Sequence, residues 1–155
     1  MYKRILVATD GSPFSEPAVV NALSLAKLCG AQLLALHVVP HYPRSYLEGG
    51  LSLSETEIHR TEQQWLDKGQ ALVDAVRARA QQAGGVDVVP LCAKASQISE
   101  AILSAASQHQ CDLIVMASHG RKGMARLLLG SETQQVLAHA GIPVLVVRSG
   151  ATKPA

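Results

Sequence analysis

Hydrophobic residues along this chain alternate between short continuous runs and longer stretches with helical spacing. Continuous apolar runs of about four to eight residues are typical of strands buried on both faces of a parallel sheet. Apolar residues spaced three or four apart indicate amphipathic helices. The pattern predicts strands over residues 2–8, 32–39, 86–92, 113–117 and 144–147, and helices over 15–29, 54–83, 98–106 and from 131 onward.

The predicted elements alternate between strand and helix along the whole chain. Strands joined by helical crossovers lie parallel, because a tight turn cannot reach a parallel neighbour, and the helices then cover the sheet. We therefore expect an α/β fold with a five-stranded, parallel, doubly wound sheet and helices on both faces. Small ligands bind such sheets beyond the carboxyl ends of the strands. Asp10 and the loop around Gly120 each follow a strand, so they would converge if those strands are neighbours.

Polar residues mark where two of the helices begin. Ser15 and Ser131 are predicted N-caps, and Glu132 suits the first turn of the last helix because of the helix dipole. Residues 40–53 carry two prolines and a Gly-Gly pair without a steady period, which indicates a loop. The sequence leaves open whether that loop closes over a ligand.

Composition limits the classes of protein that fit. At 155 residues, 48% hydrophobic and 17% charged, the chain suits one domain, which we expect over residues 1–150, with a disordered tail over 151–155. A net charge of +2 and an aromatic content of 3% disfavour binding to nucleic acid. The apolar runs are too short for a membrane span, and no signal peptide is evident. Three widely spaced cysteines indicate reduced thiols with a packing role and a cytoplasmic location.

The residues after the fourth strand carry the clearest chemical signal. No Walker motif, no G-x-G-x-x-G after the first strand, no G-x-S-x-G and no HExxH occurs in the sequence. A strand, a glycine-containing loop and a helix start nevertheless follow one another, and such an arrangement directs backbone N–H groups and a helix dipole at an anion. The residues suited to a phosphate are Gly120, Gly123, Gly130 and Ser131, flanked by Arg121, Lys122 and Arg126.

Each of these features also has an ordinary interpretation. Asp10 with the two residues after it could form only a turn, and Gly130 with Ser131 only a loop and a helix cap. His119 could be a solvated loop residue, and His37, at a strand end, is interpreted as structural. The basic residues between 121 and 126 could form a solvated loop. Their combination in one stretch is what favours a phosphate site.

Several segments, in order and spacing, resemble the universal stress protein family from residue 3 to residue 148. They are ILVATDGS, HVV, DLIVMASHGR, LLLGS and PVLVV. One branch of that family binds ATP through G-x2-G-x9-G-(S/T). In this sequence the middle glycine is Gly120, the last pair is Gly130-Ser131, and Ala117 departs from the first glycine. Alanine fits that position if its backbone is strand-like and is strained if φ must be positive.

The resemblance implies roles for individual residues. Asp10 would hydrogen-bond the ribose, Ala8 and Val38 would line the adenine pocket, and the glycine loop would hold the phosphates. A second departure lies at residues 94–97, where Lys-Ala-Ser-Gln replaces the usual glycine and proline. The full set of implied nucleotide contacts is Ala8, Thr9, Asp10, Val38, Met116, Ala117, His119, Gly120, Arg121, Gly130, Ser131 and Glu132.

The resemblance also implies a fold and a function. The fold would be Rossmann-like, of the adenine nucleotide alpha hydrolase type. The protein would bind ATP, with Mg²⁺ on the phosphates, in a stress response, as a homodimer paired through the 144–147 edge strand. Two alternatives stay open: a slow ATPase or adenylating enzyme, for which His119 is the available base, and a stress-response dimer that has lost nucleotide binding.

Overall fold

The structure is a computed structural model, and it describes residues 1–43, 53–120 and 128–149. Five parallel strands form one sheet in the order β3-β2-β1-β4-β5, which confirms the predicted fold class. In chain order the elements are β1 (Arg4–Ala8), α1 (Glu16–Cys29), β2 (Gln32–Val39), α2 (Glu55–Ala83), β3 (Val88–Lys94), α3 (Ile98–Gln108), β4 (Leu113–Ala117), α4 (Ser131–His139) and β5 (Val144–Val147).

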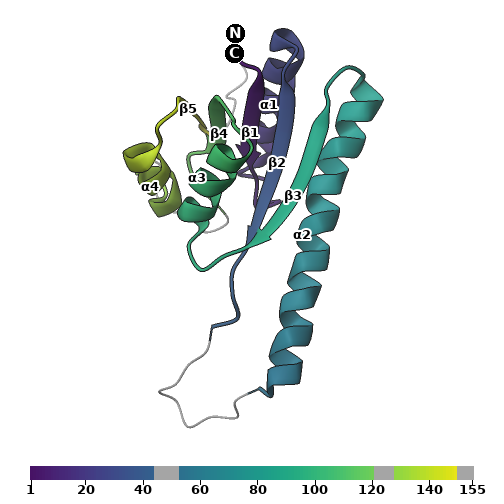
Figure 1. The fold of residues 1–155 in the computed structure, drawn as a ribbon, viewed down its shortest axis with the longest axis vertical. Helices are drawn as coiled ribbons and strands as arrows, with labels where there is room; N and C mark the ends of the chain where they lie inside the picture. The colour runs from purple at the N-terminus through teal and green to yellow at the C-terminus, as the bar shows by residue number, and fades with distance from the viewer. Residues whose placement is uncertain (44–52, 121–127, 150–155) are drawn as a thin grey trace.

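Two hydrophobic clusters lie on opposite faces of the sheet, with α1 and α2 on one side and α3 and α4 on the other (Figure 1). Successive side chains of a strand point to opposite faces, so Ile5 and Val7 belong to the first cluster and Leu6 to the second. All three side chains are fully buried. Burial on both faces explains why β1 is a continuous apolar run in the sequence.

Three strand boundaries differ from the prediction, and one of them is the end of β3, which lies at Lys94 instead of residue 92. β1 begins at Arg4 instead of residue 2. β3 begins at Val88 instead of residue 86, because residues 84–85 are glycines with φ of 70° and 97°, and pairing with β2 starts at Leu33 opposite Val88. Pro90 has no N–H to donate, and it is tolerated because β3 is an edge strand.

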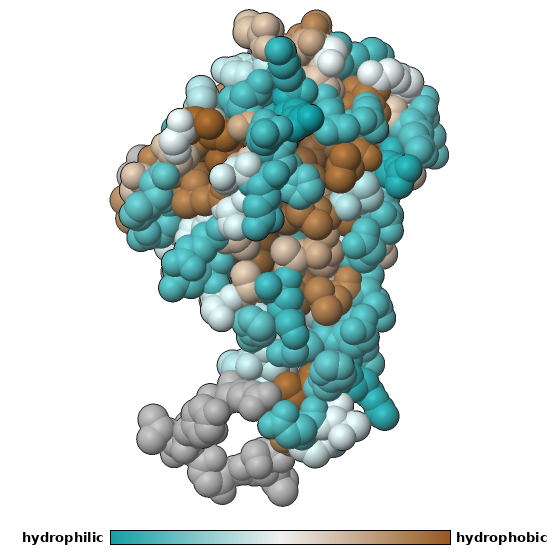
Figure 2. Space-filling view, viewed as in Figure 1, coloured by the Kyte–Doolittle hydropathy of each residue, from teal (hydrophilic) through white to brown (hydrophobic). Residues whose placement is uncertain are grey.

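The long helix α2 is amphipathic. It begins with a capping box, in which Ser54 Oγ accepts from Glu57 N at 3.2 Å while Ser54 N donates to Glu57 Oε2 at 2.8 Å. Its inner face buries Val73, Val76 and Ala80, and polar residues cover the side seen in Figure 2. Among the helices of the described residues, none combines the length and the apolar character that crossing a membrane requires.

The three cysteines are free thiols, as predicted from their spacing. Burial, followed by the nearby Asp112 carboxylate, raises the pKa of the Cys111 thiol to about 11. Burial also raises the pKa of Cys92, whose Sγ donates to Leu66 O at 3.7 Å. Because a thiol with a raised pKa stays protonated, both side chains act as packing groups instead of nucleophiles.

A glycine in the middle of α2 lets this helix approach the sheet closely. A Cβ atom placed on Gly69 would lie 2.6 Å from His37 Cδ2 on β2 and 2.7 Å from Cys92 Sγ on β3. Glycine in a helix interior costs about 1 kcal/mol relative to alanine. The helix therefore gives up intrinsic stability at Gly69 to make room for the two side chains beneath it.

Polar contacts connect α2 to the segment that follows β2. Glu62 accepts from Tyr42 N at 2.9 Å and from Lys94 Nζ at 2.8 Å, so one carboxylate joins the exit of β2 to the end of β3. Tyr42 stacks on Trp65, with 5.9 Å between the ring centroids. The Lys94 hydrogen bond, followed by that from Tyr42 N, lowers the pKa of Glu62 to about 2. We call these four residues the β2 exit clamp.

Gly69→Ala should lower the free energy of unfolding by about 1 to 2 kcal/mol, because the strain of an overpacked methyl group exceeds the gain in helix propensity. Chemical denaturation measures this change. Gly141→Ala is the matched control, since a Cβ atom there meets nothing within 4 Å, and it should change stability by less than about 0.5 kcal/mol. Equal stability of the two variants would contradict the close packing beneath Gly69.

The β2 exit clamp should loosen in acid. A carboxyl group whose pKa falls from 4.5 to about 2 on folding stabilises the folded state above pH 4.5 and loses that contribution as the pH falls towards 2. The fluorescence of Trp65, the one tryptophan in the chain, should report this loss through its stack with Tyr42. Glu62→Gln removes the titrating group, so a transition of the same amplitude in that variant would refute this assignment.

Candidate functional site

Parallel pairing of β1 with β4 brings the two predicted halves of the site together. Their register, which pairs Val7 with Val115, places the loops that follow both strands at the same edge of the sheet. A Cβ atom on Gly120 would lie 3.0 Å from Asp10 Oδ2. The predicted convergence of Asp10 with the Gly120 loop is therefore confirmed, and a side chain at position 120 would crowd the carboxylate.

The loop between β1 and α1 fixes the direction of the Asp10 carboxylate. Ser12 N donates to Asp10 Oδ1 at 2.9 Å, and Gly11 N donates to Thr9 Oγ1 at 3.2 Å. Gly11 has φ of +73°, a conformation that glycine adopts without strain. With one carboxylate oxygen held by a backbone amide, the other lies beside Gly120.

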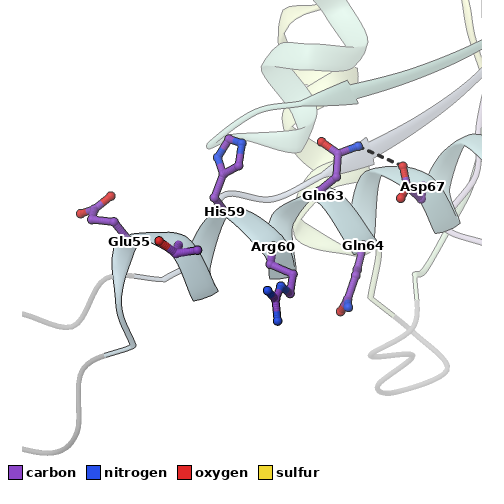
Figure 3. A pocket seen from close by; sticks show the side chains of 7 residues that line it. Glu55, His59, Arg60, Gln63, Gln64 and Asp67 are labelled. Atoms are coloured by element: carbon purple, nitrogen blue, oxygen red, sulfur yellow. Dashed lines mark hydrogen bonds between the residues drawn. The ribbon is translucent and has the colours of Figure 1, made fainter.

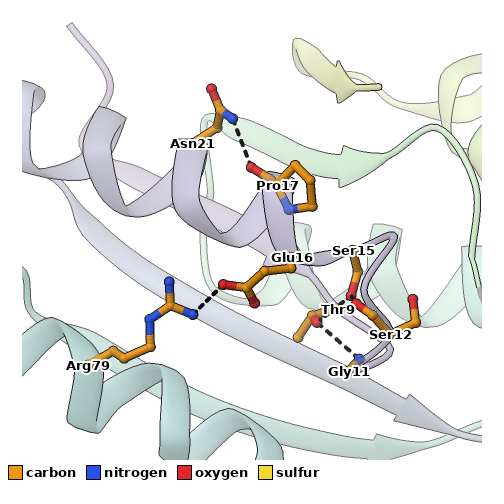
Figure 4. A network of polar contacts seen from close by, with 8 residues as sticks. All are labelled: Thr9, Gly11, Ser12, Ser15, Glu16, Pro17, Asn21 and Arg79. Carbon is orange, nitrogen blue, oxygen red and sulfur yellow. Dashed lines mark hydrogen bonds and ion pairs between the residues drawn. The ribbon is translucent and has the colours of Figure 1, made fainter. Parts of the chain in front are cut away.

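Ser15 occupies the predicted N-cap position of α1 but does not cap the helix with its side chain. Its hydroxyl donates to Ser12 O at 3.0 Å and lies 3.0 Å from Thr9 Oγ1, inside the loop network drawn in Figure 4. Beside it, Glu16 is paired with Arg79 of α2 at 2.6 Å. The Ser15 hydroxyl thus stabilises the loop that carries Asp10, and the expected role as a side-chain cap is wrong.

The start of α4 is attached to the end of β4. Gly130 N donates to Ser118 O at 2.8 Å, and Thr133 Oγ1 donates to Ala117 O at 3.0 Å. The N-cap residue is Gly130, and Ser131 is the first helical residue, so the predicted cap is displaced by one position. The N–H groups of a helix's first turn have no intrahelical partner. These contacts therefore hold the first-turn N–H groups of α4 at the edge where Gly120 lies.

Glu132 has a structural contact that the sequence did not suggest. Its Oε2 accepts from Ser99 N at 2.8 Å in the first turn of α3. The N-cap residue of α3, Gln97, makes no capping bond with its own side chain. The Glu132 carboxylate consequently caps a neighbouring helix. In the first turn of α4, Glu132 therefore presents its backbone N–H and not its carboxylate.

Ala117, which departs from the family motif, is accommodated without strain. It is the last residue of β4, pairs with Val147 and is 8% exposed. Among the described non-glycine residues, positive φ occurs at Gln110 and not at Ala117. The strand-like backbone that makes alanine compatible with this position is therefore present.

Three of the residues implied to contact the base or ribose lie on the α3 face of the sheet, whereas Ala117 belongs to the cluster on the α1 face. Met116 and Val38 are 5% and 9% exposed and belong to the second hydrophobic cluster, and half-buried Ala8 packs against it. All three lie at or near the carboxyl ends of their strands. An apolar wall thus lies on the opposite side of the sheet from α1. Arg121, the other implied contact, lies outside the described residues.

Two polar atoms of these loops are buried without a hydrogen-bond partner among the described residues. They are Ser12 Oγ and His119 Nε2. The other ring nitrogen of His119, Nδ1, lies 3.0 Å from Ser118 Oγ, so this half-buried histidine is not the solvated loop residue of the ordinary interpretation. Buried polar groups are nearly always paired in folded proteins. Unpaired atoms beside Asp10 and Gly120 therefore indicate a place where a polar ligand would complete the structure.

Two hollows in the described part of the chain lie away from these residues. One, of about 700 Å³, is lined by polar side chains of α2 alone, between Glu55 and Asp67, and Figure 3 shows these side chains pointing in different directions along the helix. The other, of about 370 Å³, lies at the amino ends of the strands beside Lys3 and Asp87. Neither hollow includes a predicted site residue, and a cluster of side chains from a single helix does not enclose a ligand.

Comparison with known proteins assigns the chain to a family. The model of the universal stress protein family matches residues 1–148. A universal stress protein of Thermus aquaticus is 36% identical over 96% of this chain and 100% of its own length. One of Methanocaldococcus jannaschii is 33% identical over 96% of this chain and 83% of its own length.

Solved structures have the same fold. UspA of Lactobacillus plantarum, at 27% identity, superposes with a TM-score of 0.76 over 95% of this chain and 98% of its own. A universal stress protein in complex with cAMP (23% identity, TM-score 0.65) and one from Archaeoglobus fulgidus in complex with dAMP (21%, 0.57) share the fold over 96% and 94% of this chain, and over 98% and 97% of their own. On the family match and the close relatives, this chain belongs to the universal stress protein family.

Proposed function

We propose that this protein is an ATP-binding module of a stress response that acts in the cytoplasm. One observation carries the proposal: the Asp10 carboxylate, Gly120 and the start of α4 lie together at the carboxyl edge of a parallel sheet. A carboxylate accepts hydrogen bonds from ribose hydroxyls, and first-turn N–H groups donate to phosphate. An apolar wall with Val38 and Met116 suits an adenine ring.

The residues present fit an adenine nucleotide in three respects. Gly120 has no side chain beside Asp10, so a ligand can approach the backbone. Ser12 Oγ and His119 Nε2 lack hydrogen-bond partners among the described residues, so both atoms could bond a polar group of the ligand. Ala117 adds only a methyl group to an unstrained strand end, which argues against loss of binding through this departure. ATP would carry Mg²⁺ on its phosphates, and the site would supply hydrogen bonds and a dipole.

Two solved neighbours support the class of ligand. Their structures are described as complexes with cAMP and dAMP, both of which contain adenine, a sugar and phosphate. We extend that class to this chain because Asp10 and the Gly130-Ser131 pair are present in it. The choice of ATP within the class rests on the resemblance of the loop to the G-x2-G-x9-G-(S/T) motif.

Binding, as opposed to turnover, is the role we propose. Both carboxylates near the loop already accept backbone hydrogen bonds, Asp10 from Ser12 N and Glu132 from Ser99 N. A general base must reach the attacking water with a free acceptor. Among the described side chains, His119 is the one that could act as a general base, through Nε2, in a slow hydrolysis of ATP.

We also propose that the protein is a homodimer paired through β5. This strand lies at the edge of the sheet beside β4, and Leu145 is 39% exposed at its centre. An open edge with apolar side chains favours association with another strand. Pairing β5 with the same strand of a second copy would cover the open backbone edge and the apolar side chains in a closed, twofold-symmetric interface.

Isothermal titration should detect saturable ATP binding by the native chain and a loss of more than about tenfold in Gly130→Glu, because a carboxylate there repels phosphate. Gly130 has φ of −60°, which glutamate adopts readily, and its Cβ atom would lie 3.3 Å from Ser118 O, so this carbonyl must shift by a few tenths of an ångström. Gly141→Glu, the same change at a glycine with open space around it, is the control and should bind as the native chain does. Absence of saturable binding by the native chain would contradict the proposed function.

Leu145→Lys should convert the homodimer to a monomer in sedimentation velocity, because a charge at the centre of the paired edge must be desolvated on association. Its circular dichroism spectrum should not change. Leu28→Lys is the matched control, since Leu28 is 84% exposed on α1 and is not part of the edge strand. A native chain that sediments as a monomer, or a dimer that survives Leu145→Lys, would refute pairing through β5.

A further inference from the structure

His37 connects β2 to the residue that precedes Asp10. The pairing of β1 with β2 ends at Ala8 opposite Leu36, and Thr9 N then donates to Leu36 O at 2.9 Å. On its other side, Thr9 O lies 2.8 Å from His37 Nδ1. A carbonyl oxygen can only accept, so the proton is on Nδ1. Thr9 is therefore held to β2 through both its N–H and its carbonyl group.

The Thr9 carbonyl belongs to the same rigid peptide plane as the amide of Asp10. Fixing the direction of that carbonyl fixes the direction in which the chain leaves β1. Asp10 is the next residue, and its Oδ1 is held in turn by Ser12 N at 2.9 Å. The imidazole of His37 thus acts on the position of the carboxylate without touching it.

The packing around His37 is arranged to hold its ring in one place. His37 lies opposite Cys92 in the pairing of β2 with β3. Gly69 of α2 lies directly over the ring, at a distance that leaves no room for a methyl group. A ring confined by the helix above and by a cysteine beside it holds its Nδ1 donor in one direction.

We infer that His37 is a positioning residue for nucleotide binding: it orients the Asp10 carboxylate through the Thr9 carbonyl. The ligand in this inference, ATP, rests on the proposed function. The arrangement of His37, Thr9 and Asp10 does not depend on that proposal. In this role the Nδ1–H donor orients the site, whereas the ring's volume fills space that a hydrophobic side chain of similar size would also fill.

Two substitutions separate the donor from the volume. His37→Asn keeps an N–H donor near the position of Nδ1 and leaves space unfilled, whereas His37→Leu fills the space without a donor. ATP affinity should therefore rank native close to Asn, with Leu weaker by about tenfold, the usual effect of one lost hydrogen bond. Melting temperature should rank native above Leu and Leu above Asn, because stability follows packing. A purely structural role for His37 would give the same order in both measurements and would overturn the inference.

Gly69→Ala provides an independent test from the other side of the ring. The added methyl group should displace His37 from Thr9 and weaken ATP binding. His37→Asn in the same chain should restore part of the binding, because asparagine lacks the Cδ2 atom that clashes, whereas Cys92 Sγ still lies 2.7 Å from the added atom. Gln70→Ala, an exposed neighbour on α2, is the control and should leave binding unchanged. Binding by Gly69→Ala equal to that of the native chain would also overturn the inference.

Hydrogen exchange in the absence of nucleotide distinguishes failure of this inference from failure of the proposed function. The amides of residues 10–12 should exchange slowly in the native chain and in His37→Asn, and faster in His37→Leu. If the native chain binds no ATP but this order holds, the proposed function fails and the positioning role of His37 stands. If ATP binds and exchange is the same in all three proteins, only the role of His37 fails.

Discussion

Parallel pairing of β1 with β4 is the constraint on which the rest of the structure depends. These strands are separated by more than a hundred residues, and β1 stands between β2 and β4, where the winding of the sheet reverses. Because the strands run in the same direction, the loops after them emerge side by side. Asp10 and Gly120 meet for this reason, and the apolar runs that bury β1 and β4 are thus also what assembles the polar site.

The fold follows from the sequence because its signals are local and repeated. β1 and β4 are buried on both faces, so nearly every residue in them is apolar, and the helices between them show helical spacing. Boundaries were harder to predict. β3 starts later than its apolar run because the glycines at 84–85 take a turn conformation and the residue pairing with β2 begins at Val88. Register and turn geometry decide such ends, and neither is written in the hydrophobic pattern.

The side-chain partners in the site show what a sequence cannot supply. Ser15 has the residue type and position of an N-cap, yet its hydroxyl bonds Ser12 O and approaches Thr9 Oγ1. Glu132 suits its own helix dipole, yet its carboxylate caps α3 through Ser99 N. Each group takes a partner that lies close only in the folded chain. Local rules therefore identified which residues carry polar groups, and the packing of α3 against α4 and of the loop against β1 decided what those groups bind.

Residues 94–97, which depart from the family pattern, include a lysine that fixes the segment after β2. Lys94 reaches Glu62 on α2, and the same carboxylate accepts from Tyr42 N after β2. Val38, proposed for the base pocket, lies only four residues before Tyr42. His37, next to Val38 in the chain, is hydrogen-bonded to Thr9 O. The exit of β2 is thus fixed twice, by the ion pair between Lys94 and Glu62 and by the imidazole donor of His37. The first contact fixes the segment that follows Val38, and the second fixes the chain that leads into Asp10.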